Sequence, residues 1–185
     1  MTYEDDGSIL IIIDKESKCR FWKNKFTIGD YASELETLPL EEIKARKFVT
    51  RSSCWLVDAP CNCVYAYGGK KFEPTASPKW LTELKCKVAA IIKANPIHLN
   101  SCNANMYKTH KQDLYWHKDN EPLFRESEFN RDTYIVSLSF GVNRTFCFRK
   151  PYEFDEIPII LGDGDIITME GRLQDRYDHT LKRED

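Results

Sequence analysis

Two kinds of apolar pattern run along the chain, one helical and one extended. Between Ser77 and Pro96, six apolar residues recur at helical spacing and form one stripe: Trp80, Leu81, Leu84, Val88, Ile91 and Ile92. Ser77 is a suitable N-cap for this helix, and Pro78 suits its first turn. A shorter helix is predicted from about Tyr31 to Leu38, with Asp30 as its cap.

Strands are predicted at Ile9–Ile13 and in short runs after Pro96. In the last part of the run that ends at Phe140, Ser137 and Ser139 alternate with apolar residues, which is the period of a strand with one buried face. The later runs are Asn100–Tyr107, Thr133–Phe140, Arg144–Arg149, Ile157–Leu161 and Asp165–Met169.

The order of these elements predicts the fold class. Helices come first and strands later, so we predict an α+β, mainly β fold with antiparallel sheets and N-terminal helices packed on one side. Two such sheets that close into a barrel or jelly roll would create a pocket between them. The sequence shows no internal repeat and no Gly/Ser linker, so residues 1–185 are expected to form a single domain.

Composition narrows the cellular setting. The longest apolar run, Ile9–Ile13, is far shorter than the roughly 20 residues that cross a bilayer, so we expect no membrane partner. The acidic first residues lack the basic region of a secretory signal. The 7 cysteines are odd in number and scattered, which favours reduced thiols in an intracellular, cytoplasmic or nuclear, protein.

The net charge of −2 argues against a generally basic nucleic-acid coat but allows a local basic patch. The residues that could form such a patch are Lys44, Arg46, Lys47, Arg51, Lys70 and Lys71, although each also fits an ordinary solvated surface.

The histidines suggest a metal site. His117 and Asp119 are two positions apart, so on an extended segment both side chains point to one face. A second histidine from a distant strand would complete the 2-His-1-carboxylate triad of non-haem Fe(II) oxygenases, and His179 is the only histidine downstream. A zinc hydrolase could use the same ligands, and an isolated H-x-D pair is common by chance. A separate zinc site on Cys54, Cys61 and Cys63 lacks a fourth ligand, so alternating strand cysteines are the favoured interpretation there.

Further motifs surround this pair in a fixed order. They are a Y-G element in Tyr65–Gly69, N-x-Y at Asn105–Tyr107, H-x-D-x-E at His117–Glu121, S-x-S-F-G ending at Gly141, R-x-F-x-F-R at Arg144–Arg149, G-D-x-x-x-M-x-G at Gly164–Gly171 and Q-x-x-x-x-H at Gln174–His179. Together they cover roughly residues 60 to 181 and resemble the AlkB family of Fe(II)- and 2-oxoglutarate-dependent dioxygenases, in particular its nucleic-acid repair branch.

This resemblance implies a double-stranded β-helix, or jelly roll, that holds Fe(II) through the catalytic ligands His117, Asp119 and His179. Asn105 and Tyr107 match positions that hydrogen-bond 2-oxoglutarate. The implied reaction is oxidative demethylation of N-alkylated bases in DNA or RNA with O2, by a monomer, on a base that is flipped or single-stranded. Candidate substrate contacts are Tyr65, Tyr67, Trp116 and Glu121.

The sequence departs from the family pattern in two places. It contains no R-x-N-x-T-x-R strand, whose arginines grip 2-oxoglutarate, so either the chain is a fragment or another cation substitutes. Arg183 does not occupy the family position. Asn120 stands where repair members often have Asp. Two other functions remain open: a non-catalytic jelly-roll binding module, and a 2-oxoglutarate oxygenase that acts on proteins or small molecules.

Overall fold

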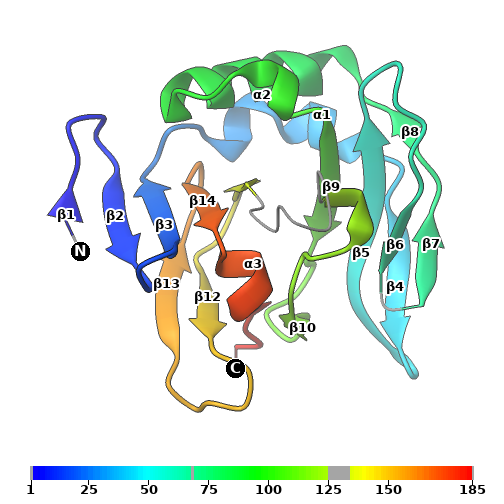
Figure 1. Cartoon of the computed structure of the whole chain (residues 1–185). Helices are drawn as coiled ribbons and strands as arrows, with labels where there is room; N and C mark the ends of the chain where they lie inside the picture. Colours follow the sequence, from blue (N-terminus) through cyan, green and yellow to red (C-terminus); the bar gives the residue numbers. More distant parts are fainter. Residues whose placement is uncertain (1, 68, 125–133, 185) are drawn as a thin grey trace. The chain divides into compact units, whose positions relative to one another are not determined.

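The computed structural model describes residues 2–67, 69–124 and 134–184, and the chain forms two compact units (Figure 1). Unit 1 contains residues 1–32 and 113–185, and unit 2 contains residues 33–112. Thr133 of one predicted strand and Gly68 of the Y-G element lie outside the described residues. Among those that are described, no helix combines the length and the apolar character needed to cross a membrane.

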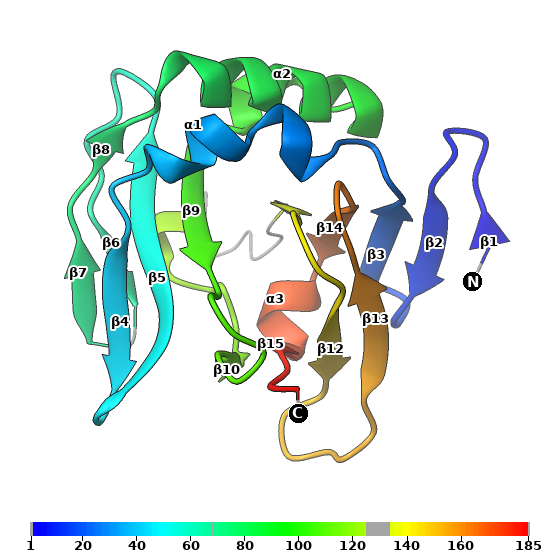
Figure 2. The same ribbon diagram turned by 180° about the vertical axis from the view of Figure 1, so that it is seen from behind.

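Unit 1 contains two antiparallel sheets, which Figures 1 and 2 show from opposite sides. The first has the spatial order β1 (Thr2–Tyr3), β2 (Ile9–Ile12), β3 (Ser17–Trp22), β14 (Ile166–Gly171), β11 (Ile135–Leu138). The second has the order β10 (Leu114–His117), β15 (Asp178–Leu181), β12 (Arg144–Arg149), β13 (Ile157–Leu161). The short helices are η1 (Ile28–Asp30), η3 (Pro122–Phe124) and α3 (Leu173–Arg176).

One apolar core joins the two sheets of unit 1. The first sheet contributes alternate residues of β3 and β14, and the second contributes alternate residues of β12 and β13. Its buried members include Cys19, Phe21, Ile167 and Met169 from the first sheet and Phe146, Phe148, Ile159 and Leu161 from the second. The sheets therefore stack face to face through one set of side chains each.

Two glycines delimit β14. Gly164 precedes the strand with φ +72°, and a Cβ atom there would lie 1.7 Å from the carbonyl oxygen of Phe26. Gly171 ends the strand with φ +66°, and its Cβ would lie 2.1 Å from the carbonyl oxygen of Glu16. Both positions combine a left-handed conformation with backbone contact, so only glycine fits them.

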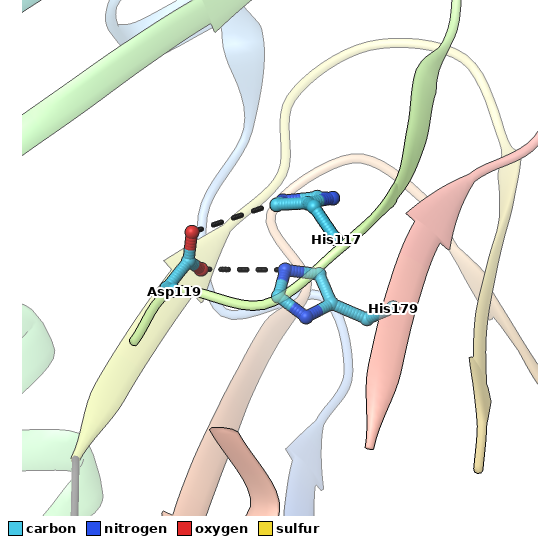
Figure 3. A group of neighbouring side chains, drawn as sticks. All are labelled: His117, Asp119 and His179. Atoms are coloured by element: carbon cyan, nitrogen blue, oxygen red, sulfur yellow. Dashed lines mark ion pairs between the residues drawn. The ribbon is translucent and has the colours of Figure 1, made fainter. Parts of the chain in front are cut away.

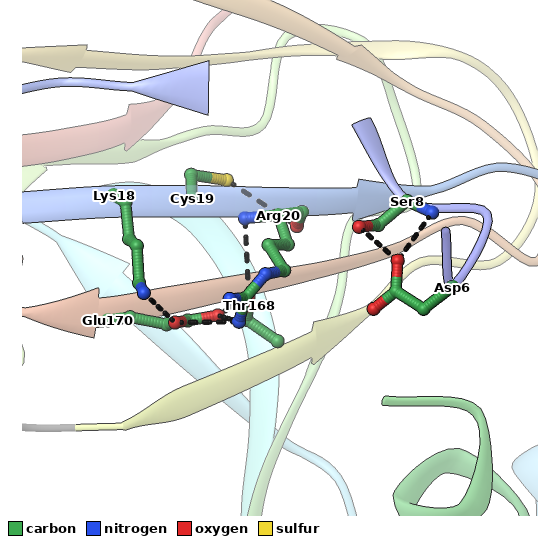
Figure 4. Close-up of polar contacts among 7 residues, drawn as sticks. All are labelled: Asp6, Ser8, Lys18, Cys19, Arg20, Thr168 and Glu170. Atoms are coloured by element: carbon green, nitrogen blue, oxygen red, sulfur yellow. Dashed lines mark hydrogen bonds and ion pairs between the residues drawn. The ribbon is translucent and has the colours of Figure 1, made fainter. Parts of the chain in front are cut away.

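The other face of the β3–β14 pair carries a buried ion network (Figure 4). Arg20 Nη1 donates to both carboxylate oxygens of Glu170, at 2.8 and 2.9 Å, and Thr168 Oγ1 donates to the same carboxylate at 2.7 Å. Lys18 Nζ lies 3.5 Å from Glu170 Oε2, and Glu170 is only 6% exposed. Arg20, Thr168 and Lys18 therefore together offset the cost of burying this carboxylate.

Unit 2 is built around the long strand β5 (Phe48–Val57). It pairs antiparallel with β4 (Glu41–Ala45) and β9 (Ser101–Met106), and parallel with β8 (Thr75–Ala76). The remaining elements are α1 (Ala32–Glu36), whose residues from Ser33 onward belong to this unit, the hairpin of β6 (Tyr65–Tyr67) and β7 (Lys70–Phe72), α2 (Lys79–Ile92) and η2 (Pro96–His98).

Helix α2 has the predicted apolar face, with Leu81, Leu84, Val88 and Ile92 buried. The predicted Ser77 cap is wrong, because Pro78 is the N-cap and no side chain caps the helix. The Ser77 hydroxyl instead accepts a hydrogen bond from the buried Lys85, which also pairs with Asp58.

The mainly β, antiparallel character is confirmed, but the expected order of helices before strands is wrong. β1–β3 precede α1, and β4–β8 lie between α1 and α2. The predicted strand Ile9–Ile13 corresponds to β2, and the five later predicted runs correspond to β9, β11, β12, β13 and β14. The missed strand β3 contains Lys18 and Arg20, whose charges are typical of a surface segment but here serve the Glu170 network.

The cysteines also differ from the prediction in part. Cys61 and Cys63 lie outside the strands and form a disulfide, so the alternating-strand interpretation and the expectation of reduced thiols are both wrong for them. Cys54 is buried in β5 with a free thiol. Burial raises the pKa of this thiol to about 12, with Cys102 adding to the rise, which disfavours a thiolate that could bind zinc.

The Glu170 network generates a stability prediction. Replacing Arg20 with Met leaves the Glu170 carboxylate buried without the guanidinium that contacts both of its oxygens, so we expect a loss of about 3 kcal/mol in the free energy of unfolding. The Lys18→Met variant is the matched control, because this more exposed pair should contribute less than about 1 kcal/mol. Urea denaturation of both variants measures the difference, and equal losses would contradict the role given to Arg20.

Candidate metal centre

Strand pairing brings the two histidines of the predicted triad together. His117 ends β10 and His179 lies in β15, and the two residues are direct partners in the antiparallel pairing of these strands. Their ring centroids are 4.1 Å apart. Asp119 follows β10, and one ligand atom from each of the three residues lies within 4.8 Å of the others (Figure 3). The convergence predicted from the sequence is therefore observed.

The hydrogen bond made by His117 Nδ1 determines that the other ring nitrogen, Nε2, can bind a cation. Its Nδ1 lies 2.7 Å from the carbonyl oxygen of Tyr115, which can only accept, so Nδ1 carries the hydrogen. In the neutral ring the lone pair is then on Nε2, which lies 3.7 Å from Asp119 Oδ1. A cation between His117 Nε2 and the Asp119 carboxylate would be bound by both groups.

His179 is buried at the margin of the unit 1 core, against two phenylalanine rings. The residue is 3% exposed, and its ring stacks on Phe146 at a centroid distance of 5.4 Å and an interplanar angle of 29°. Phe148, its direct partner in β12, lies 6.3 Å away between centroids. His179 Nε2 is 3.3 Å from Asp119 Oδ2, so the aspartate faces both imidazoles.

Gln174 fixes the backbone of the aspartate. The Asp119 amide donates to Gln174 Oε1 at 2.9 Å, and the Gln174 side-chain amide contacts the Met169 sulfur at 3.1 Å. Gln174 is 1% exposed and lies in α3, the short helix just before β15. The Q-x-x-x-x-H motif thus supplies both a metal-ligand candidate and the group that positions another.

The donor set fits a mid-hardness divalent cation. Two imidazoles and one carboxylate on one side leave further coordination positions open, the arrangement typical of Fe(II) oxygenases. Within the part of the chain that the structure describes, no other group of three or more His, Cys, Asp or Glu side chains meets the same distance criterion.

Two of the predicted substrate contacts, Trp116 and Glu121, belong to unit 1 and flank the metal-ligand candidates His117 and Asp119 in the sequence. Trp116 packs under Arg149, whose guanidinium carbon is 4.0 Å from the ring centroid. Arg149 neighbours Phe148, which packs against His179, so Arg149 and Trp116 occupy the face of the sheet away from the three ligands. Glu121 is half-buried two residues after Asp119, and its carbonyl accepts from the Phe124 amide at the start of η3.

A pocket of about 690 Å³ lies on this outer face of unit 1. Lys118, Arg149 and Asp178 are among its lining residues, and each is a sequence neighbour of a metal-ligand candidate or of its packing partner. Because successive side chains of a strand point to opposite faces, one residue can face the metal centre while its neighbour lines the pocket.

Unit 2 contains the other predicted site residues. Tyr65 is 2% exposed, and its ring lies 5.0 Å from Trp55, 5.8 Å from Phe72 and 6.3 Å from Tyr67 between centroids. This packing fits a supporting role for Tyr65, whereas Tyr67 is only half-buried. Asn105 is half-buried in β9, and Tyr107 is half-buried just after that strand. Substrate and cosubstrate contacts by these residues remain predictions.

The structure also singles out Arg51, which the sequence suggested only as part of an exposed basic patch. Arg51 is 5% exposed, so the patch prediction is wrong for it, whereas Lys44, Arg46, Lys47, Lys70 and Lys71 are exposed. Arg51 Nε donates to Asn105 Oδ1 at 2.8 Å, and its guanidinium lies 5.8 Å from the Tyr67 ring. No sequence signal marked Arg51 as buried, because the strand β5 that pairs with β9 was not predicted.

Comparisons with known proteins agree with this chemistry. Residues 23–185 match the profile of the 2OG-Fe(II) oxygenase superfamily. The protein named alpha-ketoglutarate-dependent dioxygenase alkB homolog 3 is 31% identical in Homo sapiens over 143 residues, and 32% identical in Mus musculus over 144 residues. Each match covers 72% of this chain and 46% of the relative, so the chain spans less than half the length of these curated relatives.

A solved structure described as "The structure of OsALKBH1" superimposes with a TM-score of 0.62, covering 95% of this chain and 88% of the other. The sequence identity is 15%, so this match concerns the fold alone.

The contact between Gln174 and Asp119 gives a prediction about metal affinity. Gln174→Met removes the acceptor of the Asp119 amide while keeping an apolar chain of similar size, so we expect about tenfold weaker Fe(II) binding. Arg176→Gln on the same helix is the control and should bind as the wild type does. Anaerobic Fe(II) titration compares them, and an unchanged affinity in Gln174→Met would mean that Asp119 needs no such support.

Proposed function

This chain belongs to the 2OG-Fe(II) oxygenase superfamily and is an AlkB-type member of it, and from this membership we propose that it oxidatively removes alkyl groups from the bases of DNA or RNA. The observation that carries the proposal is the convergence of His117, Asp119 and His179 on one point. The order of the surrounding motifs, which resembles that of the nucleic-acid repair branch, favours a base as the substrate.

The cofactors are Fe(II) and 2-oxoglutarate. His117 Nε2, His179 Nε2 and the Asp119 carboxylate are the groups that would hold the iron. When bound, Fe(II), 2-oxoglutarate and O2 together supply the oxidation of the alkyl carbon. We further propose that Asn105 and Tyr107 hydrogen-bond 2-oxoglutarate, as the N-x-Y motif implies.

The proposed net reaction balances without a further reductant. One oxygen atom of O2 ends in succinate as 2-oxoglutarate loses CO2, and the other ends on the N-alkyl carbon. For a methyl group the resulting hemiaminal releases formaldehyde, and the base nitrogen keeps a hydrogen. The protein's own task is to orient the base and to exclude water, and for this we propose Tyr67 and Glu121 as contacts, with Tyr65 and Trp116 as further candidates.

We also propose that residues 1–185 act as one AlkB-like jelly-roll domain. The superfamily profile covers most of both units, and the antiparallel sheets of unit 1 share one core. The five free cysteines, Cys19, Cys54, Cys86, Cys102 and Cys147, favour an intracellular, cytoplasmic or nuclear, monomer that meets its nucleic acid there.

An activity assay tests the proposed function. With Fe(II), 2-oxoglutarate and O2, the wild-type chain should form succinate and release formaldehyde from N-methylated single-stranded oligonucleotides. Asp119→Ala should abolish both products with little change in melting temperature, since Asp119 follows a strand and its side chain is 20% exposed. His98→Ala, which changes an exposed histidine outside the triad, is the matched control and should retain activity.

The two products separate the parts of the proposal. Succinate without demethylated oligonucleotide would contradict the nucleic-acid substrate and favour a protein or small-molecule oxygenase. Absence of succinate from a correctly folded, iron-loaded chain would contradict catalysis and favour a binding module.

A further inference from the structure

The pocket of about 690 Å³ in unit 1 contains a cation and an acid that face each other across two strands. Arg149 in β12 and Asp178 in β15 are direct partners in the pairing of these strands, and both side chains are half-buried. Within the part of the chain that the structure describes, neither forms an ion pair, and the buried Arg149 Nε has no hydrogen-bond partner. The pocket therefore offers a donor group and an acceptor group to a ligand.

The two cations of the pocket are held in place by unit 1. The Arg149 guanidinium lies over the half-buried ring of Trp116, with its central carbon 4.0 Å from the ring centroid. This stacking restricts the orientations of the guanidinium but leaves its edge free to donate. Lys118 Nζ donates to the carbonyl oxygen of Asp175 at 2.6 Å, so its position is fixed by a neutral group and its charge is not cancelled.

Two aromatic rings complete the pocket from the loop 150–156, which joins β12 to β13 (Figure 1). Tyr152 is 99% exposed and Phe154 is 95% exposed, so neither ring contributes to the apolar core. Tyr152 has a φ of +66°, a left-handed conformation that costs free energy in any residue with a side chain. Large exposed rings on a turn of this kind indicate a surface that binds a partner.

This combination of groups fits a nucleotide of a single strand. The flat face of a base stacks on aromatic rings, and its edge carries both hydrogen-bond donors and acceptors, which suit Asp178 and Arg149. A phosphate of the strand would meet Lys118. A free phosphate or carboxylate would use the cations but not the rings, and it would be repelled by Asp178. A peptide lacks the regular alternation of flat ring and anionic linker.

We propose that this pocket is a second nucleic-acid site, which binds a nucleotide of a single strand by stacking its base on Tyr152 and Phe154. Arg149 and Asp178 contact the edge of that base, and Trp116 supports Arg149. Because the pocket lies on the face of the sheet away from the three metal-ligand candidates, the nucleotide bound there is not the one that is oxidised. The inference rests on nucleic acid as the partner in the proposed function, and the motifs give Tyr152 and Phe154 no role.

Binding to an unmethylated oligonucleotide tests the pocket without any turnover. The double variant Tyr152→Leu/Phe154→Leu keeps apolar side chains but removes both flat rings, so its affinity for a labelled single strand should fall about tenfold. Its affinity for the duplex should change less than about twofold, because the bases of a duplex are already stacked. Tyr3→Leu removes an exposed tyrosine of β1 in the same unit and is the matched control, with wild-type affinity expected. Fluorescence anisotropy measures all of these affinities.

A second double variant separates stacking from folding. Tyr152→Phe/Phe154→Trp keeps two aromatic rings and should bind the single strand as the wild type does. Unchanged affinity in the leucine variant, or a wild-type chain that binds no single strand, would overturn the inference and leave the rings to another partner, such as a protein. Deoxyadenosine monophosphate that displaced the strand at equal concentration would assign the pocket to a free nucleotide and would also overturn it.

Kinetics on a methylated single strand distinguish this inference from the proposed function. The leucine variant should raise KM about tenfold and leave kcat unchanged, because the pocket holds the strand equally in the ground state and in the transition state. Formaldehyde release with a wild-type KM in the leucine variant would contradict the second site alone. Ring-dependent binding of the strand by a wild-type chain that releases no formaldehyde would contradict the proposed function alone.

Discussion

The antiparallel pairing of β10 with β15 is the constraint on which the metal centre depends. It sets His117 directly opposite His179, although the two residues are far apart in the sequence. The β15–β12 pairing then sets Phe148 opposite His179, so the ring is packed from the other side as well. A slip of either strand by one residue would place the two imidazoles on opposite faces of the sheet. Backbone hydrogen bonding between the strands thus determines which side chains meet at the metal centre.

Glu170 and Arg51 are both buried charged residues, but their neighbours compensate the two charges differently. Glu170 receives its compensation inside unit 1, from Arg20 and Thr168, and so belongs to the structure of the sheet. Arg51 in unit 2 is equally inaccessible, but among the described residues it meets a neutral amide and an aromatic ring. A buried ion with a carboxylate partner is compensated for its lost hydration, whereas a buried ion with only neutral neighbours is compensated less.

How far the sequence predicts this molecule depends on the range of the interaction. The H-x-D spacing indicated His117 and Asp119 as a local pair, and the resemblance to the AlkB family added His179, so the three residues that converge were predicted. The stripe of α2 was predictable because helical spacing is a local pattern as well. By contrast, the contact of Gln174 with Asp119 and the burial of Arg51 arise between distant segments, which no local pattern records. The segment that contains Arg51 is rich in Lys and Arg and is typical of a surface, and only its pairing with β9 reveals otherwise.

Gly164 and Gly171, the glycines at the two ends of β14, fix the number of residues between them. Because Gly164 touches the backbone of Phe26 and Gly171 touches that of Glu16, both ends of β14 are clamped to the segments that flank β3. Side chains between the two clamps can change as long as their faces are kept, but the number of residues cannot, since an added residue would displace one glycine from its contact. Among related sequences, variation in this segment should therefore take the form of substitution, with insertions and deletions confined to the loops beyond the clamps.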